Sequence, residues 1–386
     1  MLQNKVLSQA FEFHFDIKMV KKITKKSFKI NWSPPAIEKE EKQAAMKVIN
    51  SGWMTQGKIT ENLEKKICQY TDAKYAVVTN NGTSALICSL LAHGIGPGDE
   101  VIVPSFTFVA TVNSVLAVGA KPVLVDCDPR TFNTTVDLMK QKLSKKTRCI
   151  IPVDVAGMPI DIDEFRKFAK IHDLIMIEDA AEGIGASYKN KILGSFGHTT
   201  IFSFHMAKVV AGIEGGCIVT NDKKIAQSAR LIRSHGDAGQ YDSRIFGLNF
   251  RISDVHSAII LEQLKKINRF LNHRKKIASI YKEELKNCTF QEIPEYVTRH
   301  PYMLFYALFP AKTRNKINNY LNKNGIETRI CWPPIHLQKY HSKLFANPNF
   351  QNTEKIFSKT ICLPMGNNIS ENDAFLIVDY CNKYLI

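Results

Sequence analysis

The stretch Tyr75–Gly94 reads YAVVTNNGTSALICSLLAHG and decides what kind of fold this chain adopts. Its first five residues, Tyr75–Thr79, are mostly apolar or β-branched and predict a buried strand. Asn80-Asn81-Gly82 predicts a turn, because Asn and Gly tolerate the backbone angles that turns need. Thr83–Gly94 then predicts a helix. A strand, a tight turn and a helix in succession form the repeating unit of α/β proteins.

The same alternation extends along the chain in both directions. Apolar strand segments are separated by amphipathic helical segments, which indicates a mostly parallel sheet covered by helices on both faces. Right-handed crossovers then give a doubly wound α/β layer. The expected strands are Glu100–Pro104, Pro122–Asp126, Cys149–Val155 and Leu174–Glu178, and the expected helices are Ala36–Ser51, Glu61–Tyr70, Phe108–Val118 and Ile162–His172.

The pattern changes after a long helical stretch at Ser253–Asn287. We expect a small α+β domain there, with strands at His300–Phe309 and Glu327–Cys331 and helices at Ala311–Asn324 and Ser370–Tyr384. The chain therefore divides into three predicted parts. They are a basic N-terminal extension at 1–29, for which disorder is one expectation, a large domain at 30–265 and a small C-terminal domain at 266–386.

The composition of the 386 residues, 45% hydrophobic and 23% charged, is that of an ordinary globular protein. No apolar run approaches the roughly 20 residues that span a bilayer, so we expect no membrane segment. Lys21 and Lys22 follow the apolar start of the chain instead of preceding it, which is unlike a secretory signal. We therefore expect a cytoplasmic protein. Its nine dispersed cysteines form no Cys-x-x-Cys pair, so we predict reduced thiols and no metal site.

The formal net charge of +16 suits an anionic ligand. The basic residues are spread along the chain and no helix-turn-helix, zinc-finger or RNA-recognition pattern accompanies them. We therefore expect no nucleic-acid partner. A charge of this size would also attract a nucleotide diphosphate or an anionic surface.

Three groups of residues are candidates for a site, and two of them follow predicted strands, where ligands bind in open α/β sheets. Asp179 comes directly after an apolar strand and is either a helix N-cap or a functional acid. Gly82-Thr83-Ser84 opens a helix, and its unpaired N–H groups suit an anion, although a simple capping turn explains it too. Lys208 lies among apolar residues and glycines, where burial favours the neutral amine; the alternative is an ordinary surface lysine.

Together these groups supply what a pyridoxal-phosphate (PLP) enzyme needs. A lysine binds the cofactor covalently, an acid keeps the pyridine nitrogen protonated, and a helix N-terminus with hydroxyls holds the phosphate. Asp179 precedes Lys208 by 208 − 179 = 29 residues, which leaves room for a strand, a turn and another strand.

From about Ile30 to its end, the chain resembles the DegT-type sugar-nucleotide aminotransferases, which are fold-type-I PLP enzymes. The resemblance implies a large PLP-binding domain, with a mostly parallel seven-stranded sheet sandwiched by helices, and a smaller C-terminal α+β domain. Its motifs occur in the family order. They are Ser51–Gly57 (SGWMTQG), Asn81–Leu86 (NGTSAL), Gly96–Val101 (GPGDEV), Pro104–Phe108 (PSFTF), Glu178–Glu182 (EDAAE), Ser203–Lys208 (SFHMAK), Glu214–Gly216 (EGG), Gly247–Arg251 (GLNFR) and Pro334–His336 (PIH).

The resemblance implies roles for the cofactor-binding residues. Lys208 looks like the Schiff-base lysine and proton shuttle, and Asp179 like the partner of the pyridinium nitrogen. Phe108 takes the place of the aromatic residue that stacks on the ring. Glu182 stands where the family places a polar residue near the ring's 3-hydroxyl. Gly82, Thr83 and Ser203 match the phosphate cradle, and Asn249 matches a residue that reaches the phosphate from the neighbouring subunit, which implies a homodimer with shared sites.

Plainer interpretations stay open for some of these residues. Phe108 is also a core candidate, Glu182 a solvated helix residue and Asn249 a turn residue. Among expected substrate-binding residues, Thr55 and Gln56 lie in the segment that lines the sugar pocket of such enzymes. His205 and His336 suit structural or substrate-lining roles, and Arg251 and Arg329 suit either the nucleotide diphosphate or structural ion pairs.

Two positions separate this chain from parts of the family. Asp154 stands where many members have His, which we expect to alter the substrate pocket but not the PLP set. Lys208 argues against the branch that carries His instead and dehydrates sugars.

The expected activity is PLP-dependent transamination of a nucleotide-linked keto-sugar, most simply a 4-keto-6-deoxy sugar, with L-glutamate as donor and 2-oxoglutarate as product. Such a reaction serves amino-sugar and surface-glycan biosynthesis. A 3-keto-sugar or cyclitol aminotransferase of the same family is the alternative. A non-catalytic regulatory paralogue is a further alternative, although it predicts a lost lysine or acid, and both are present.

Overall fold

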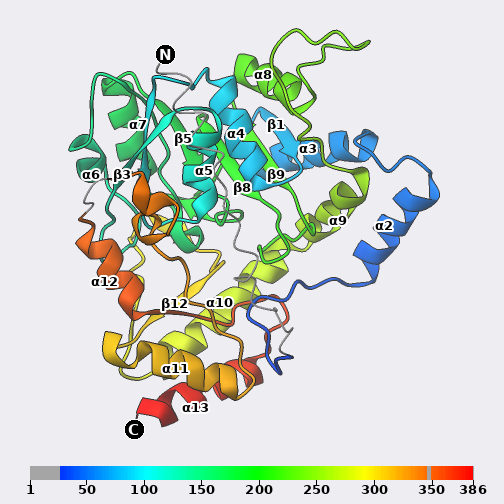
Figure 1. Ribbon diagram of the computed structural model, residues 1–386. Coiled ribbons are helices and arrows are strands. Elements are labelled where there is room, and N and C mark those ends of the chain that lie inside the picture. The colour runs from blue at the N-terminus through cyan, green and yellow to red at the C-terminus, as the bar shows by residue number, and fades with distance from the viewer. Residues whose placement is uncertain (1–26, 346–348, 386) are drawn as a thin grey trace, which may run out of the picture.

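The computed structural model describes residues 27–345 and 349–385, so most of the predicted extension at 1–29 lies outside the described residues (Figure 1). At the centre is a seven-stranded sheet with the order β1-β9-β8-β5-β4-β2-β3. The run from β8 to β3 is parallel, and β9 is antiparallel to both β8 and β1. The strands are β1 Tyr75–Thr79, β2 Glu100–Pro104, β3 Lys121–Val125, β4 Thr147–Ile150, β5 Ile175–Asp179, β8 Thr199–Ser203 and β9 Gly216–Thr220.

Each face of the sheet packs against its own helices, because successive side chains of a strand point to opposite faces. In β1, Val77 joins one apolar cluster while Ala76 and Val78 join the other. The first cluster includes residues of α4 (Gly82–Ala92), α5 (Val109–Ala117) and α8 (Lys223–Arg233). The second includes residues of α3 (Lys58–Thr71), α7 (Ile162–Ile171) and α9 (Asp254–Lys265). This confirms the predicted α/β sandwich.

The smaller C-terminal domain has a separate apolar cluster. Its antiparallel sheet has the order β10-β12-β13 and packs with α10, α11 and α13 (Figure 1). A short sheet of β6, β7 and β11 completes the strands among the described residues. The bounds are β6 Ser187–Tyr188, β7 Lys191–Ile192, α10 Ile267–Glu284, β10 Thr289–Phe290, β11 Val297–Arg299, β12 Phe305–Leu308, α11 Ala311–Lys323, α12 Gln351–Lys359, β13 Thr360–Leu363 and α13 Glu371–Leu385.

Four sequence-based expectations differ from the structure. The strand expected at Cys149–Val155 is instead β4, which ends at Ile150, and a 3-10 turn occupies Val155–Gly157. The strand expected at Glu327–Cys331 is wrong, because only one isolated bridge joins Arg329 to Cys362. The long helical stretch breaks at Lys266, whose amine bonds to three glutamates at the start of α2 (Lys39–Asn50). The strand expected at His300–Phe309 shortens to β12. The domain boundary at 265/266 stays a prediction. No helix in the described part of the chain combines the length and apolarity that crossing a membrane demands.

Candidate active site

A cavity of about 670 Å³ lies at the carboxyl-terminal edge of the sheet. Its wall contains residues that follow β1, β2, β5 and β8, together with Met303 and Trp332 from the second half of the chain. This is the position at which parallel strands bring the residues after their ends together. The predicted site residues that line it are Gly82, Thr83, Phe108, Asp179, Glu182, Ser203, His205 and Lys208.

Lys208 stands on the loop between β8 and β9, which is closed by backbone hydrogen bonds. The N–H of Lys208 donates to the carbonyl of His205 at 2.8 Å, and the N–H of Gly212 donates to the carbonyl of Phe204 at 2.7 Å. The side chain of Lys208 is 14% exposed and its Nζ lies 3.2 Å from Oε1 of Glu182. Lys208 is therefore not an ordinary surface lysine. Its amine has a charged partner, whereas the sequence suggested mainly apolar surroundings.

Asp179 ends β5 as a buried carboxylate. Its Oδ2 accepts a hydrogen bond from Oγ1 of Thr111 at 2.7 Å, and its Oδ1 accepts from the N–H of Ala181 at 3.2 Å. Burial raises the pKa of Asp179, while the bonds from Thr111 and Ala181 and the charge of Lys208 oppose that rise. A turn follows β5 where a helix would have to begin, so the N-cap interpretation is wrong. Such a desolvated carboxyl is suited to a cationic partner.

Glu182 is buried, so the interpretation as a solvated helix residue is wrong. Its Oε2 accepts from the N–H of Ala156 at 2.9 Å while Oε1 bonds to Lys208. The turn that carries Ala156 fits closely, because a Cβ on Gly157 would lie 2.3 Å from the carbonyl oxygen of Glu182. Glu182 is thus fixed on one side by backbone and on the other by the lysine.

Asp154 begins this same turn but does not line the cavity. It is fully buried, its Oδ1 accepts from the N–H of Ile160 at 3.0 Å, and its Oδ2 has no partner among the described residues. Burial, followed by the charges of Glu178 and Asp179, raises its pKa well above the usual range. Asp154 therefore does not contact the cavity directly, and the expectation that it alters the substrate pocket stays a prediction.

The N-terminus of α4 forms one end of the cavity. The Oδ1 of Asn81 accepts from the N–H of Ser84 at 2.8 Å, and the first N–H groups of a helix have no partner within it. A Cβ on Gly82 would lie 3.1 Å from Cβ of Ser203, and a Cβ on Gly216 would lie 2.2 Å from the carbonyl oxygen of Asn81. These glycines let three segments meet around a space with hydroxyls and N–H groups. That donor set fits a phosphate.

Phe108 is 52% exposed, so it is not a core residue. It lies at the N-cap of α5, lines the cavity and meets the Trp332 ring edge-on at 5.1 Å between centroids. His205 and Glu214 lie at the same cavity, 3.8 Å apart and both half-exposed. Burial lowers the pKa of His205 and the charge of Glu214 opposes this effect.

Other predicted residues lie outside this cavity. Thr55 and Asn249 are exposed, and Gln56 lies on the loop between α2 and α3. His336 is buried, with hydrogen bonds to Ser105 at 2.7 Å and to Glu354 at 3.1 Å, as a structural residue would be. Arg329 pairs with Glu327 and lies over the ring of Trp32, which lines the cavity.

Arg251 has no ion pair in the part of the chain that the structure describes, which leaves its structural alternative without support. It follows Phe250, whose carbonyl accepts the N–H of Asn80 at 2.9 Å beside the α4 turn.

Sequence reasoning missed Thr111, Trp32 and Trp332. Thr111 bonds to Asp179, and its position in the first turn of α5, three residues after Phe108, is the one signal that pointed to it. The two tryptophans come from segments far from the strand ends, so no local pattern marks them as cavity residues.

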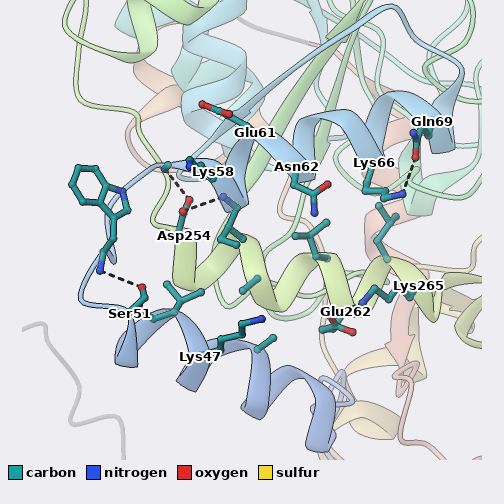
Figure 2. Close-up of a pocket in the computed structure, with 18 of the residues that line it drawn as sticks. Lys47, Ser51, Lys58, Glu61, Asn62, Lys66, Gln69, Asp254, Glu262 and Lys265 are labelled. Carbon is teal, nitrogen blue, oxygen red and sulfur yellow. Dashed lines mark hydrogen bonds and ion pairs between the residues drawn. The ribbon is translucent and has the colours of Figure 1, made fainter.

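A second, larger hollow, which we call the groove, lies between α2, α3 and α9 and has a volume of about 980 Å³ (Figure 2). Among its lining residues is Asp254, which accepts hydrogen bonds from the N–H groups of Gly57, Ile59 and Thr60. Lys47, Lys58, Lys66 and Lys265 also line it. Of the residues described there, none is a predicted site residue.

The chain is similar to known proteins over most of its length. The family model described as DegT/DnrJ/EryC1/StrS aminotransferase family matches residues 35–381. GDP-perosamine synthase of Caulobacter vibrioides is 33% identical over 367 residues, which are 93% of this chain and 99% of that protein.

Two solved structures extend the match. Helicobacter pylori PseC, an aminotransferase involved in the biosynthesis of pseudoaminic acid, is 29% identical, with a TM-score of 0.86 over 93% of this chain and 99% of that chain. The PLP form of a putative sugar aminotransferase from Streptococcus pneumoniae is 28% identical, with a TM-score of 0.87 over 92% of this chain and 100% of that chain.

Proposed function

The chain belongs to the DegT/DnrJ/EryC1/StrS aminotransferase family, and from this premise we propose that it transfers the amino group of L-glutamate to a nucleotide-linked 4-keto-6-deoxy sugar. It is a PLP-dependent sugar aminotransferase, since its relatives are sugar aminotransferases and one was solved in its PLP form. The donor and the particular sugar are the parts that we propose. So are the site residues.

One observation carries the assignment of roles. Lys208 and Glu182 are in contact at 3.2 Å in the same cavity as buried Asp179, beside the N-terminus of α4. PLP, when bound there, supplies an electron-accepting ring that eases loss of a proton from the carbon bearing the amino group. This cofactor requires a lysine, a ring-nitrogen partner and a phosphate site of the protein, and the residues to which we assign these three roles lie at one cavity.

The chain's own residues then have distinct tasks. Asp179 carries a negative charge against the ring nitrogen and holds that nitrogen's proton; the hydroxyl of Thr111 orients it at 2.7 Å. Lys208 would bind the cofactor and, once released, would carry a proton from the donor carbon to the cofactor in the first half of the reaction and from the cofactor to the sugar carbon in the second half. Glu182, held by the N–H of Ala156, keeps the Lys208 amine inside the cavity.

The sugar side of the cavity is aromatic. Trp32, Phe108 and Trp332 all line it, and Arg329 lies 5.8 Å from the ring centroid of Trp32. Aromatic faces suit a base or a sugar ring, and an arginine fork suits a diphosphate. The net charge of +16 also favours an anionic substrate. The Caulobacter relative is a GDP-perosamine synthase, which supports a nucleotide-linked substrate here.

We further propose a homodimer with shared active sites. Asn249 is exposed in one copy, and the segment before it exposes Tyr241, Ile245 and Phe246. Several large apolar side chains on one loop favour a protein contact over solvent. Mixing a Lys208→Ala chain with an Asn249→Ala chain is expected to restore activity that neither homodimer has. No recovery after mixing, with dimers present, would contradict shared sites.

The substrate is tested by incubating the protein with PLP, L-glutamate and a panel of nucleotide-linked 4-keto and 3-keto sugars and cyclitol ketones. We expect a mass gain from ketone to amine on a 4-keto-6-deoxy sugar, with 2-oxoglutarate formed in equal amount. Amination of a 3-keto sugar or a cyclitol alone would select the alternative. No amination of any ketone, together with no exchange between glutamate and 2-oxoglutarate, would select the non-catalytic paralogue.

A further inference from the structure

We propose that the C-terminal domain positions Lys208 through a clamp formed by Arg274, Asn367 and the backbone of Val209. The proposal rests on the proposed function in one respect, the attachment of the cofactor to Lys208. Arg274 belongs to α10, and Asn367 to the loop between β13 and α13. Both are positioning residues, since among the described residues neither touches the Lys208 side chain.

The backbone on both sides of Lys208 is tethered by side chains from distant segments. The carbonyl oxygen of Ala207 accepts from Oγ of Ser33 at 2.9 Å, and the carbonyl oxygen of Val209 accepts from Nδ2 of Asn367 at 3.0 Å. Neither donor belongs to β8 or β9, the strands that carry the loop. The direction of the Lys208 side chain therefore depends on segments outside the sheet.

Arg274 fixes the amide of Asn367. Its side chain is fully buried, and its Nε donates to Oδ1 of Asn367 at 2.7 Å. Its Nη1 donates to the carbonyl oxygens of Tyr302, Met303 and Met365 at 2.9, 3.2 and 3.0 Å. With Oδ1 engaged by a cation, the Asn367 amide has only one orientation available, in which Nδ2 faces Val209.

The loop of Asn367 cannot shift independently. The N–H of Met365 donates to the carbonyl of Trp32 at 2.9 Å, and a Cβ on Gly366 would lie 2.7 Å from Cδ of Pro34. Trp32 and Met303 both line the cavity, and the carbonyl oxygen of Met303 accepts a hydrogen bond from Arg274. The same guanidinium thus connects one wall of the cavity with the lysine loop.

The test compares Asn367→Asp and Asn367→Ala with Asn368→Ala as matched control. Asp at 367 keeps an acceptor for Arg274 but cannot donate to Val209, so it removes only the second half of the clamp. The neighbouring Asn368 donates to the carbonyl of Pro35 at 2.9 Å and belongs to the same loop, but it makes no bond to the Lys208 segment.

Two measurements on the PLP-loaded full chain read the clamp. The first is the rate of amide hydrogen exchange in peptides covering 204–212. We expect this rate to rise about fivefold in Asn367→Asp, because the loss of one hydrogen bond makes local opening about fivefold more frequent. The second is the pH at which the bound cofactor's visible absorbance changes, which we expect to shift in Asn367→Asp and not in Asn368→Ala. Asn367→Ala is expected to show both effects with an additional fall in Tm.

A purely structural role for Asn367 predicts a different outcome. If Asn367→Asp shows wild-type exchange in 204–212 and a wild-type absorbance titration, the clamp is refuted, whatever its Tm. Should Asn367→Ala fail to fold, Asn367→Asp decides by the same two readings. Absence of cofactor absorbance in the wild type would instead refute the proposed function, and the exchange measurement would still judge the clamp.

Discussion

The larger of the two hollows described above has the less reactive buried acid, and the smaller has the more reactive one. The groove between α2, α3 and α9 is larger, about 980 Å³, but its buried acid, Asp254, is engaged by three backbone N–H groups and the hydroxyl of Thr60 (Figure 2). The cavity at Lys208 is about 670 Å³, and its buried Asp179 has two hydrogen bonds and a raised pKa.

The comparison teaches that volume does not identify the reactive site. The carboxylate of Asp254 is engaged by the N–H groups at the start of α3, whereas Asp179 is desolvated and able to stabilise a cation that enters. Lysines line both hollows, but only Lys208 combines a buried carboxylate partner with a nearby helix N-terminus. If the account is right, equivalent substitutions in the two hollows will have different consequences.

The largest expected difference is between the lysines. Lys208→Ala removes the group that we propose binds the cofactor and moves the proton, so transamination is expected to fall about 10³-fold or more. Lys66→Ala, in the groove, is expected to keep wild-type turnover. Steady-state rates of both variants with glutamate and a keto-sugar measure the contrast. Equal losses in the two variants would break it.

The next difference is between the acids. Asp179→Asn leaves the ring nitrogen without an anionic partner, and we expect kcat to fall about 10²-fold. Asp254→Asn disturbs the cap of α3 and should lower Tm by about 4 °C, because a buried hydrogen-bond acceptor is weakened, while kcat stays near wild type. Parallel kinetics and thermal melts separate the two effects. A fall in kcat for Asp254→Asn without a fall in Tm would connect the groove to the chemistry.

A smaller effect is expected from a methyl group at the phosphate end. Gly82→Ala places a Cβ 3.1 Å from Cβ of Ser203, so the segments that hold the phosphate must separate and the Kd for PLP should rise about tenfold. Gly96→Ala is the control, since its Cβ would meet its nearest neighbour at an ordinary 3.7 Å. Titration of both proteins with PLP measures the difference, and unchanged affinity in Gly82→Ala would place the phosphate elsewhere.

The smallest effect concerns stability and its sign. Burial raises the pKa of Asp179 in the folded protein above its unfolded pKa of about 3.8. Below pH 3.8 the carboxyl is protonated in both states and costs the fold nothing, and as pH rises through the folded pKa the buried charge destabilises the fold. Asp179→Asn should therefore raise Tm at pH 7 by about one or two degrees in protein prepared without PLP, because the substitution removes the buried charge. Melts of both proteins at pH 4 and pH 7 test this, and an Asp179→Asn Tm below the wild-type Tm at pH 7 would contradict the expected sign.

The strands that carry the site could be predicted closely from the sequence. Tyr75–Thr79 and Glu100–Pro104 have the predicted bounds, because each is a short apolar run closed by turn-forming residues. Asp179 could be singled out because strand ends in an open sheet converge at one edge. The strand before Lys208, β8, was not among the expected strands, and Lys208 was singled out by the apolar residues and glycines around it. Those signals are local in sequence.

Other features depend on contacts that no local pattern encodes. No strand forms at Glu327–Cys331, because the backbone there pairs with Cys362 at the single position of Arg329. The side chain of Arg329 forms an ion pair with Glu327, two residues earlier. The contact between Lys208 and Glu182 relies on the turn at Ala156, which has a positive φ of 62°. A backbone conformation that a non-glycine residue rarely adopts is set by its packing and not by its own sequence.

The most direct test of the central claim is to load the wild-type protein with PLP, reduce it with borohydride and map the modified peptide by mass spectrometry. Reduction makes the bond between cofactor and lysine permanent, so the position of the label reports which amine the cofactor binds. The account predicts the label on Lys208. A label on Lys47, Lys58, Lys66 or Lys265, the lysines of the larger groove, or no label on any lysine, would contradict it.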